Sequence, residues 1–165
     1  MLESRTLWIS KSEVASDSSP RRSEMIRTVR WEFGGREVGW IVAHPLRWWP
    51  WKLIATMSAF EGPDRSAVFA GRRAGWWPGD WDVHEADGRL VGLVRGAHVL
   101  YAAGEILGQV IREQEGAAGR IVSPGGSRLV EWKPLDAGTR IEFDANLDEQ
   151  PFAKMAVIIA VLIGL

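Results

Sequence analysis

Residues 152–165 read F-A-K-M-A-V-I-I-A-V-L-I-G-L, and Lys154 is the only charged residue in this stretch. A helix that is apolar on every side has to be surrounded by other apolar groups. At 1.5 Å per residue the stretch reaches about 21 Å, which is shorter than the roughly 30 Å hydrocarbon core of a bilayer. We therefore predict a helix over 152–164 that is enclosed by protein. A C-terminal membrane anchor is the rival interpretation, and the short length argues against it.

The sequence before this helix is typical of short strands separated by turns. Gly-Gly at 34–35 and Asp-Gly at 87–88 supply the positive φ that tight hairpins require. Most prolines fall between the apolar runs, where they cost no ladder hydrogen bond. We predict no helix before residue 152. The predicted strands are 25–33, 36–43, 52–60, 65–71, 80–85, 89–95, 97–102, 105–114, 119–123, 128–133 and 139–144, with a weaker candidate at 5–10.

A weak internal repeat suggests how these strands are arranged. An apolar residue followed by glycine recurs after the turns, at Val38-Gly39, Val91-Gly92 and Leu107-Gly108. Glycine inside a strand usually marks a bulge, a bend or the close approach of another backbone. The repeat therefore favours strands that curve around a central object, for which the terminal helix is the candidate. The fold class that we predict is mainly β, a closed antiparallel barrel of about ten to twelve strands around a buried apolar C-terminal helix.

The chain divides into two parts in this interpretation. Residues 13–23 are polar and lack periodicity, so 1–24 is expected to be a flexible N-terminal arm. Residues 25–165 form the barrel with its central helix at 152–164. The length of 165 residues suits one domain with a sizeable core.

Two stretches resemble a known superfamily. W-D-V-H-E-A-D-G-R-L-V-G-L-V-R at 81–95 is similar to its recurring hairpin unit, and I-E-F-D-A-N-L-D-E-Q-P-F-A-K-M-A-V-I-I-A-V-L-I at 141–163 is similar to its last strand and buried helix. The superfamily contains phospholipid scramblases, plant LURP-one-related proteins and tubby C-terminal domains. The resemblance covers roughly 25–165 and implies a closed barrel with an apolar C-terminal helix threaded through it. It also implies a surface that binds phosphoinositide headgroups, as in tubby domains.

The chain departs from scramblases where they carry an acidic calcium segment. Residues 134–140 read P-L-D-A-G-T-R, in which only Asp136 is a potential ligand. The near-match D-A-N-L-D at 144–148 has Glu149 where the calcium loop needs glycine and Met155 where it needs glutamate. We therefore expect no metal site. Asp144 and Asp148 are instead expected to end the strand, with Asp148 and Glu149 favoured near the helix N-terminus.

Tryptophan is the most unusual feature of the composition, with 10 residues against a single Tyr. Indoles have an apolar body and a polar N–H, and arginine and lysine pair with phosphates, so two Trp-basic segments suit a layer of lipid headgroups. The alternative is that these tryptophans pack the faces of the sheet. The candidate lipid-binding residues are Arg47, Trp48, Trp49, Trp51, Lys52, Arg72, Arg73, Trp76 and Trp77.

Other function classes receive little support from the sequence. There is no cysteine, no H-E-x-x-H, no G-x-S-x-G and no P-loop, so we predict no enzyme and no cofactor. His84, Glu85 and Asp87 are the loose acid–base grouping that an enzyme hypothesis would use. Twenty basic against 21 acidic residues disfavour nucleic acid. The predicted partners are an anionic phospholipid surface or another protein. Without an N-terminal apolar run of signal-peptide length, the expected location is cytoplasmic, peripheral to a membrane.

Overall fold

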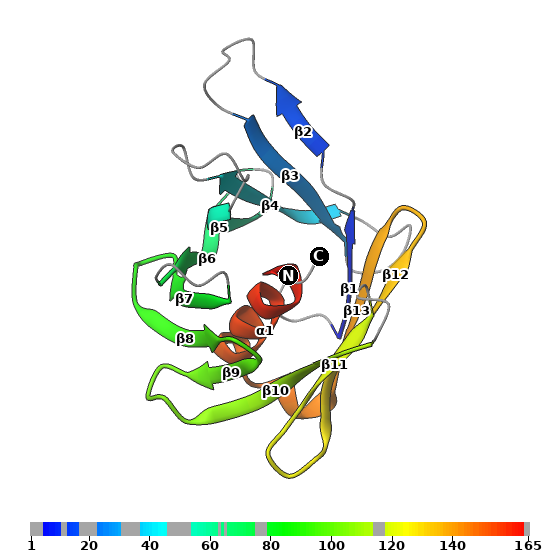
Figure 1. Cartoon of the computed structure of the whole chain (residues 1–165). Helices are drawn as coiled ribbons and strands as arrows, with labels where there is room; N and C mark the ends of the chain where they lie inside the picture. Colours follow the sequence, from blue (N-terminus) through cyan, green and yellow to red (C-terminus); the bar gives the residue numbers. More distant parts are fainter. Residues whose placement is uncertain are drawn as a thin grey trace.

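The computed structural model describes residues 5–10, 13–16, 23–30, 37–45, 54–62, 64, 66–74, 79–113 and 118–163. Within these residues there are thirteen strands, one short 3₁₀ helix and one α-helix (Figure 1). The elements are β1 (Thr6–Ser10), β2 (Glu13–Ser16), β3 (Ser23–Arg30), β4 (Glu37–Pro45), β5 (Ile54–Glu61), β6 (Ser66–Arg73), β7 (Asp80–Glu85), β8 (Leu90–Arg95), β9 (His98–Tyr101), β10 (Ile106–Arg112), β11 (Gly119–Val122), β12 (Arg128–Leu135), β13 (Gly138–Phe143), η1 (Ala145–Leu147) and α1 (Pro151–Ile163).

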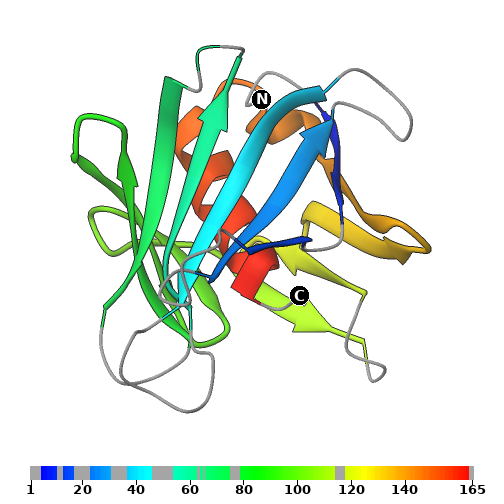
Figure 2. The same ribbon diagram turned by 90° about the horizontal axis from the view of Figure 1, so that it is seen from above.

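All thirteen described strands belong to one antiparallel sheet. Each strand from β2 to β12 pairs with the next strand along the chain, and β13 pairs with β1. The first and last described strands of the chain are thus neighbours, with Leu7 of β1 opposite Ile141 of β13. Figure 1 shows the strands arranged around α1, and in Figure 2 the helix runs within the curve of the sheet. The predicted mainly β fold, with one large antiparallel sheet and a C-terminal helix, is confirmed.

The prediction of a completely closed barrel is wrong. β1 meets β3 through two residue pairs only, Trp8 with Arg30 and Ile9 with Val29. The reason is that the same edge of β3 is already occupied over 23–26, where it pairs with β2. Only the end of β3 remains for β1. The sheet is therefore curved but not closed into a barrel, and it has thirteen described strands rather than ten to twelve.

The N-terminal segment takes part in the sheet. β1 and β2 both lie inside the range 1–24 that the sequence predicted as a flexible arm. Leu7 and Ile9 have 0% exposure and belong to the main hydrophobic core. Thr6–Ser10 therefore form part of the core sheet, which corrects the predicted arm there. Residues 1–4, 11–12 and 17–22 lie outside the described residues.

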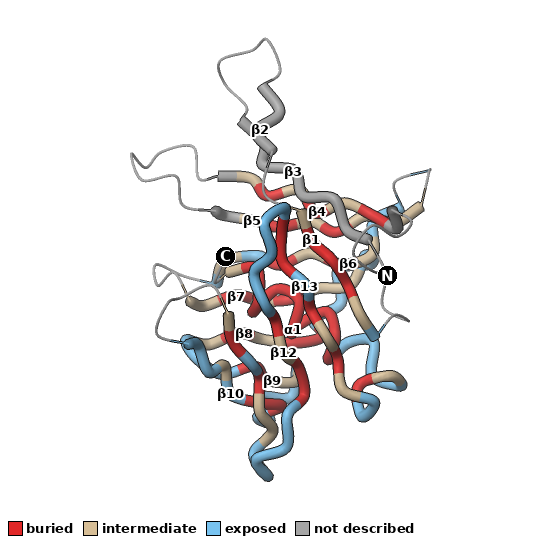
Figure 3. The backbone as a smooth tube through the Cα atoms, turned by 90° about the vertical axis from the view of Figure 1, so that its right-hand side faces the viewer, coloured by how far each residue is buried: buried red, intermediate tan, exposed pale blue. Residues whose placement is uncertain are grey.

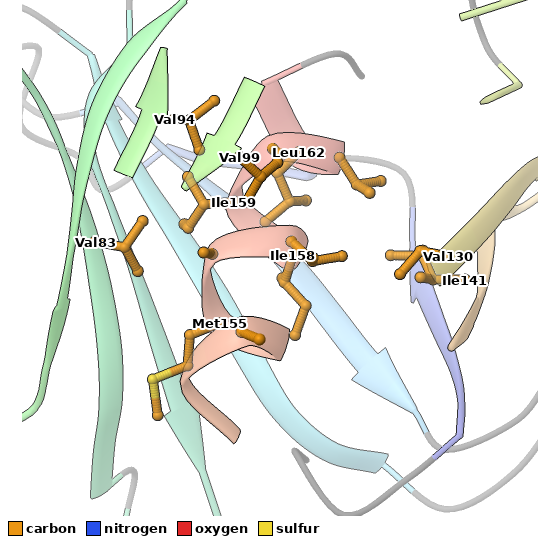
Figure 4. Packing of buried hydrophobic residues seen from close by; sticks show 14 of the residues in the cluster. Val83, Val94, Val99, Val130, Ile141, Met155, Ile158, Ile159 and Leu162 are labelled. Atoms are coloured by element: carbon orange, nitrogen blue, oxygen red, sulfur yellow. The ribbon is translucent and has the colours of Figure 1, made fainter. Parts of the chain in front are cut away.

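The C-terminal helix fills the concave side of the sheet. α1 is buried from Ala153 to Leu162, and it packs against β6, β7, β8 and β9. Figure 3 shows that the buried residues gather on α1 and on the inward-facing strand positions. In Figure 4, Ile158 points toward Val130 and Ile141 of the opposite wall. The helix therefore forms the centre of the core, as its uniformly apolar sequence predicted.

The repeated glycines coincide with β-bulges. The register of the sheet skips Val38, Val91 and Leu107, each immediately before a repeat glycine. Val91 and Leu107 are buried, and so are the glycines that follow them. A bulge places two successive residues on the same side of a sheet, and it increases the local twist. The bulges therefore curve the sheet around α1, and the second inward position is kept small.

Candidate functional site

The structure describes two of the nine candidate lipid-binding residues. Arg72 and Arg73 lie at the end of β6, where Arg72 is exposed and Arg73 is half-buried. No ion pair joins Arg72 to a residue that the structure describes. The other seven candidates fall in 46–53 and 75–78, which lie outside the described residues. Those seven assignments stay predictions.

The two Trp-basic segments, 46–53 and 74–79, are flanked by strand ends that lie at the same end of the sheet. His44 of β4 lies opposite Thr56 of β5, Thr56 lies opposite Arg72 of β6, and Arg72 lies opposite Asp82 of β7. This single cross-strand row stands beside the end of β4, the start of β5, the end of β6 and the start of β7. The chain segments 46–53 and 74–79 therefore both connect neighbouring strands at one end of the sheet. Sequence alone gave no means of relating these two segments.

The tryptophans that the structure describes are mostly part of the packing. Trp81 and Trp132 are each 2% exposed on inward-facing strand positions, and Trp8 is 6% exposed. Trp40 is half-buried on β4. Trp81 lies next to the second Trp-basic segment in the sequence, yet its side chain belongs to the core. For these residues the packing interpretation of the tryptophans holds.

The acid–base grouping of His84, Glu85 and Asp87 forms hydrogen bonds within the β7–β8 hairpin. His84 Nδ1 lies 3.0 Å from the Gly88 carbonyl oxygen, within the turn between β7 and β8. Arg89 donates to Glu85 at 2.6 Å, and its backbone N–H donates to Asp87. The hydrogen bond to Glu85 is the main cause of the raised pKa of Arg89. Each of these side chains is engaged within the turn, so the arrangement explains the hairpin geometry.

The predicted strand end at Asp144 is confirmed. Asp144 caps η1 by accepting a hydrogen bond from the Asn146 backbone N–H at 3.0 Å. Asp148 accepts from Arg5 Nε at 2.6 Å, and it lies 3.5 Å from Lys154 Nζ. Among the described residues, no group of three His, Asp or Glu side chains is placed to hold a metal ion.

Lys154 is a residue whose role the sequence analysis missed. Its side chain has 0% exposure, and its Nζ lies 5.3 Å from the centre of the Phe143 ring. Asp148 connects this buried ammonium to Arg5, the residue before β1, and the hydrogen bond from Arg5 is the main cause of the lowered pKa of Asp148. The three side chains, which we call the Arg5–Asp148–Lys154 clasp, link the N-terminal strand to the helix. The signal in the sequence was a single charge in an apolar helix.

An open groove surrounds the N-terminal end of α1. It has a volume of 590 Å³ and is lined by parts of β8, the β9 end and the first helical turn. Phe152 and Leu90 are 37% and 38% exposed on its wall. Of the helices that the structure describes, none has both the length and the apolar character needed to cross a membrane.

One solved structure matches the chain in fold. It is the X-ray structure of a protein from Arabidopsis thaliana, AT5G01750, which is 10% identical and superposes with a TM-score of 0.58. The match covers 96% of this chain and 91% of that chain. At this identity the likeness shows the fold alone. No protein-family model and no curated protein matches the chain.

Proposed function

We propose that the protein is a non-enzymatic binding module of the scramblase, LURP-one-related and tubby-like superfamily, which contacts anionic phospholipid headgroups peripherally. The superfamily assignment is supported by the fold, a curved antiparallel sheet around a C-terminal apolar helix. It is further supported by the resemblance of 81–95 and 141–163, which correspond to the β7–β8 hairpin and to β13 with α1.

The observation that carries the lipid proposal is the shared end of the sheet. Segments 46–53 and 74–79 contain five of the ten tryptophans, together with Arg47 and Lys52. Both segments begin and end on the neighbouring strands β4 to β7, and Arg72 stands exposed in the row beside them. Indoles and cations carried by two connections that leave the same end of the sheet suit a headgroup layer, because arginine binds phosphate and indole prefers the membrane interface.

Vesicle co-sedimentation of the full chain tests this proposal. We expect binding to vesicles with anionic lipid, no binding to neutral vesicles, and weaker binding at high salt because the charges are screened. Trp48→Ala/Trp49→Ala should abolish most of the binding. Arg72→Ala should weaken it by about fivefold, since one basic residue near an anionic surface contributes about 1 kcal/mol. Arg120→Ala on β11 removes an exposed cation from another part of the sheet and serves as the matched control.

A folded chain that binds neither vesicle type overturns the lipid proposal. The remaining interpretation is then a protein-interaction domain without a lipid ligand. Equal losses in Arg72→Ala and Arg120→Ala would indicate attraction by the net charge rather than contact through this end of the sheet.

A further inference from the structure

The groove at the start of α1 lies at the opposite end of the sheet from the row His44–Thr56–Arg72–Asp82. Its lining includes Pro151 and Phe152 of α1, Leu90 of β8 and Tyr101 of β9. A second groove of 660 Å³ shares Phe152 and Pro151, and it is lined by the β5–β6 and β7–β8 connections. These connections leave β5, β6 and β7 at the ends away from the His44–Asp82 row. The groove is thus independent of the proposed lipid contact.

The groove has the size and the lining of a small-molecule site. Pockets for small ligands range from about 300 to 1,000 Å³, and they are mainly apolar with a few placed polar groups. Most large apolar side chains of α1 are buried, yet Phe152 is 37% exposed and lines both grooves. The wall is already fixed, because Tyr101 donates to Gln150 at 2.9 Å and the Gln150 amide donates to the Asn146 carbonyl at 3.2 Å. A fixed wall reduces the entropy lost on binding.

The charges of the groove favour a cation. Among the described residues that line the groove, the charged ones are Arg89 and Glu149, and Arg89 forms an ion pair with Glu85 at 2.6 Å. Glu149 has no ion pair with any residue that the structure describes. The helix N-terminus contributes a partial positive charge of about +0.5, which stabilises this carboxylate but is smaller than its full charge. The unbalanced charge of the groove is therefore negative.

One face of the Phe152 ring is already covered by a cation, so the ring offers a ligand an apolar contact. The guanidinium carbon of Arg89 lies 4.8 Å from the ring centre, so one cation already stands over this aromatic side chain. The face of an aromatic ring attracts cations through its quadrupole. An apolar chain against Leu90 and Phe152 would leave a terminal charge within reach of Glu149, which lines the same groove.

We propose that this groove binds a small amphipathic organic cation, with its apolar part against Leu90 and Phe152 and its ammonium group at Glu149. The site takes a single aliphatic or aromatic chain that carries one positive charge. It is a binding site separate from the lipid surface, and it has no need of a membrane.

A titration followed by amide NMR of the full chain tests the site with three probes of equal chain length. Hexyltrimethylammonium should shift the amides of Leu90, Tyr101 and Phe152, whereas hexanol should bind more weakly and hexanoate most weakly. Glu149→Gln should weaken the ammonium probe by about two- to fivefold, as expected for one exposed charge pair. Phe152→Ala should weaken it by about fivefold or more through loss of the ring and its apolar area. Phe152→Leu keeps an apolar side chain and should give an intermediate loss.

Glu142→Gln on the outer face of β13 is the control, and it should leave the affinity unchanged. The proposal is overturned if hexanoate or hexanol binds as tightly as the ammonium probe, or if Glu149→Gln has no more effect than Glu142→Gln. It is also overturned if no probe shifts these amides up to the highest concentration at which the probes stay monomeric. Vesicle binding should be unaffected by Glu149→Gln, so failure of this site and failure of the lipid proposal are separate results.

Discussion

A single charged side chain decides much of the electrostatics of the core. Lys154 is completely buried, and Asp148 provides a carboxylate at 3.5 Å while staying 28% exposed itself. An ammonium ion without a partner costs several kcal/mol in a protein interior, even after relaxation. Asp148 thus holds the charge that allows Lys154 to lie in the core, and Arg5 fixes Asp148 in place. The Arg5–Asp148–Lys154 clasp therefore offsets the cost of burying the Lys154 charge.

Removing the charge of Asp148 and removing the charge of Lys154 should affect stability differently. Asp148→Asn removes the carboxylate that lies 3.5 Å from the Lys154 ammonium, and we expect a clearly lower urea midpoint. Lys154→Met replaces the ammonium by an apolar side chain of similar length, and such replacements are often neutral or stabilising. The double variant should recover most of the stability lost in Asp148→Asn, and a double-mutant cycle measures this recovery. If the loss of unfolding free energy in the double variant equals the sum of the losses in the two single variants, Asp148 does not stabilise the protein through Lys154.

The stability of the protein should fall at acid pH through two carboxylates. The hydrogen bond from Arg5 lowers the pKa of Asp148 below its ordinary 3.8, and the hydrogen bond from Lys133 lowers the pKa of Glu131 below its ordinary 4.5. A lowered folded-state pKa gives stability that is present above the ordinary pKa and is lost as the pH falls through the lowered value. We expect unfolding free energies to decline below about pH 4.5. Asp148→Asn should show a shallower decline; an unchanged slope contradicts this assignment.

At the scale of single elements, the strand that follows a bulge meets the helix directly. A Cβ added at Gly92 would lie 2.8 Å from the Ala156 Cβ and 3.2 Å from the Leu100 carbonyl oxygen. At Gly71 it would meet Ile159 at 2.8 Å. Both strands therefore approach α1 closely; at Gly71 the Ile159 side chain would have to shift, whereas at Gly92 the obstacles are the Ala156 Cβ and a backbone oxygen, which have little freedom to move. The small residue of the helix, Ala156, faces one of these glycines, so the contact is matched from both sides.

Gly92→Ala should destabilise the protein by about 1–3 kcal/mol, because overpacking of a filled core forces shifts of the backbone or of side chains. Adding Ala156→Gly should recover part of the lost stability. The recovery is reduced by up to about 1 kcal/mol, because glycine is unfavourable within a helix. Gly125→Ala is the control, since its nearest neighbour outside the adjacent residues is Ser123 Oγ at 3.8 Å. Chemical denaturation measures the unfolding free energy of the three variants. Equal losses in Gly92→Ala and Gly125→Ala would contradict the close contact between Gly92 and α1.

Strands and helices whose signal lies within a short stretch of sequence could be predicted. β7 matches its predicted range of 80–85, and α1 begins one residue before the predicted 152. Hairpins with Asp-Gly or Gly-Gly turns and an apolar helix carry their signal within a few residues. β2 was missed because Glu13–Ser16 has no apolar alternation and gains its ladder from β3. The incomplete closure at β1 and β3 depends on residues far apart in the chain, which local patterns do not contain.

The candidate sites were less predictable than the fold. The composition of 46–53 and 74–79 was visible in the sequence, but their connection to one end of the sheet follows only from the register of β4 to β7. The groove at Phe152 had no sequence signal, because its walls come from β8, β9 and α1 and their spacing is set by tertiary packing. Residue types can be read from a sequence, whereas the distances between them require the fold.

At the scale of the whole molecule, the sheet depends on the helix for its core. Six large apolar side chains of α1 are buried among the strands: Met155, Val157, Ile158, Ile159, Val161 and Leu162. Burial of each contributes at least about 1.5 kcal/mol. Together they match the total stability of about 5–15 kcal/mol of an ordinary domain. The strands alone would leave their concave face open to water.

Deleting 152–165 should therefore abolish cooperative unfolding. We expect the truncated chain to lose the dispersed amide NMR spectrum and to bind a hydrophobic dye. Ile106→Ser is a suitable control, because Ile106 is 51% exposed and its loss should change stability by no more than about 0.5 kcal/mol. A truncated chain that still unfolds cooperatively would favour the rival interpretation of the helix as a separable anchor.

The position of α1 in the chain has a consequence for biosynthesis. All described strands leave the ribosome before the helix does. β1 can form its longest pairing only after β13 has been synthesised. A nascent chain that has released all its strands still lacks the segment that covers their apolar face. The order of the elements thus makes packing of the helix a late step of folding, and until that step the newborn sheet exposes an apolar surface that is prone to aggregation.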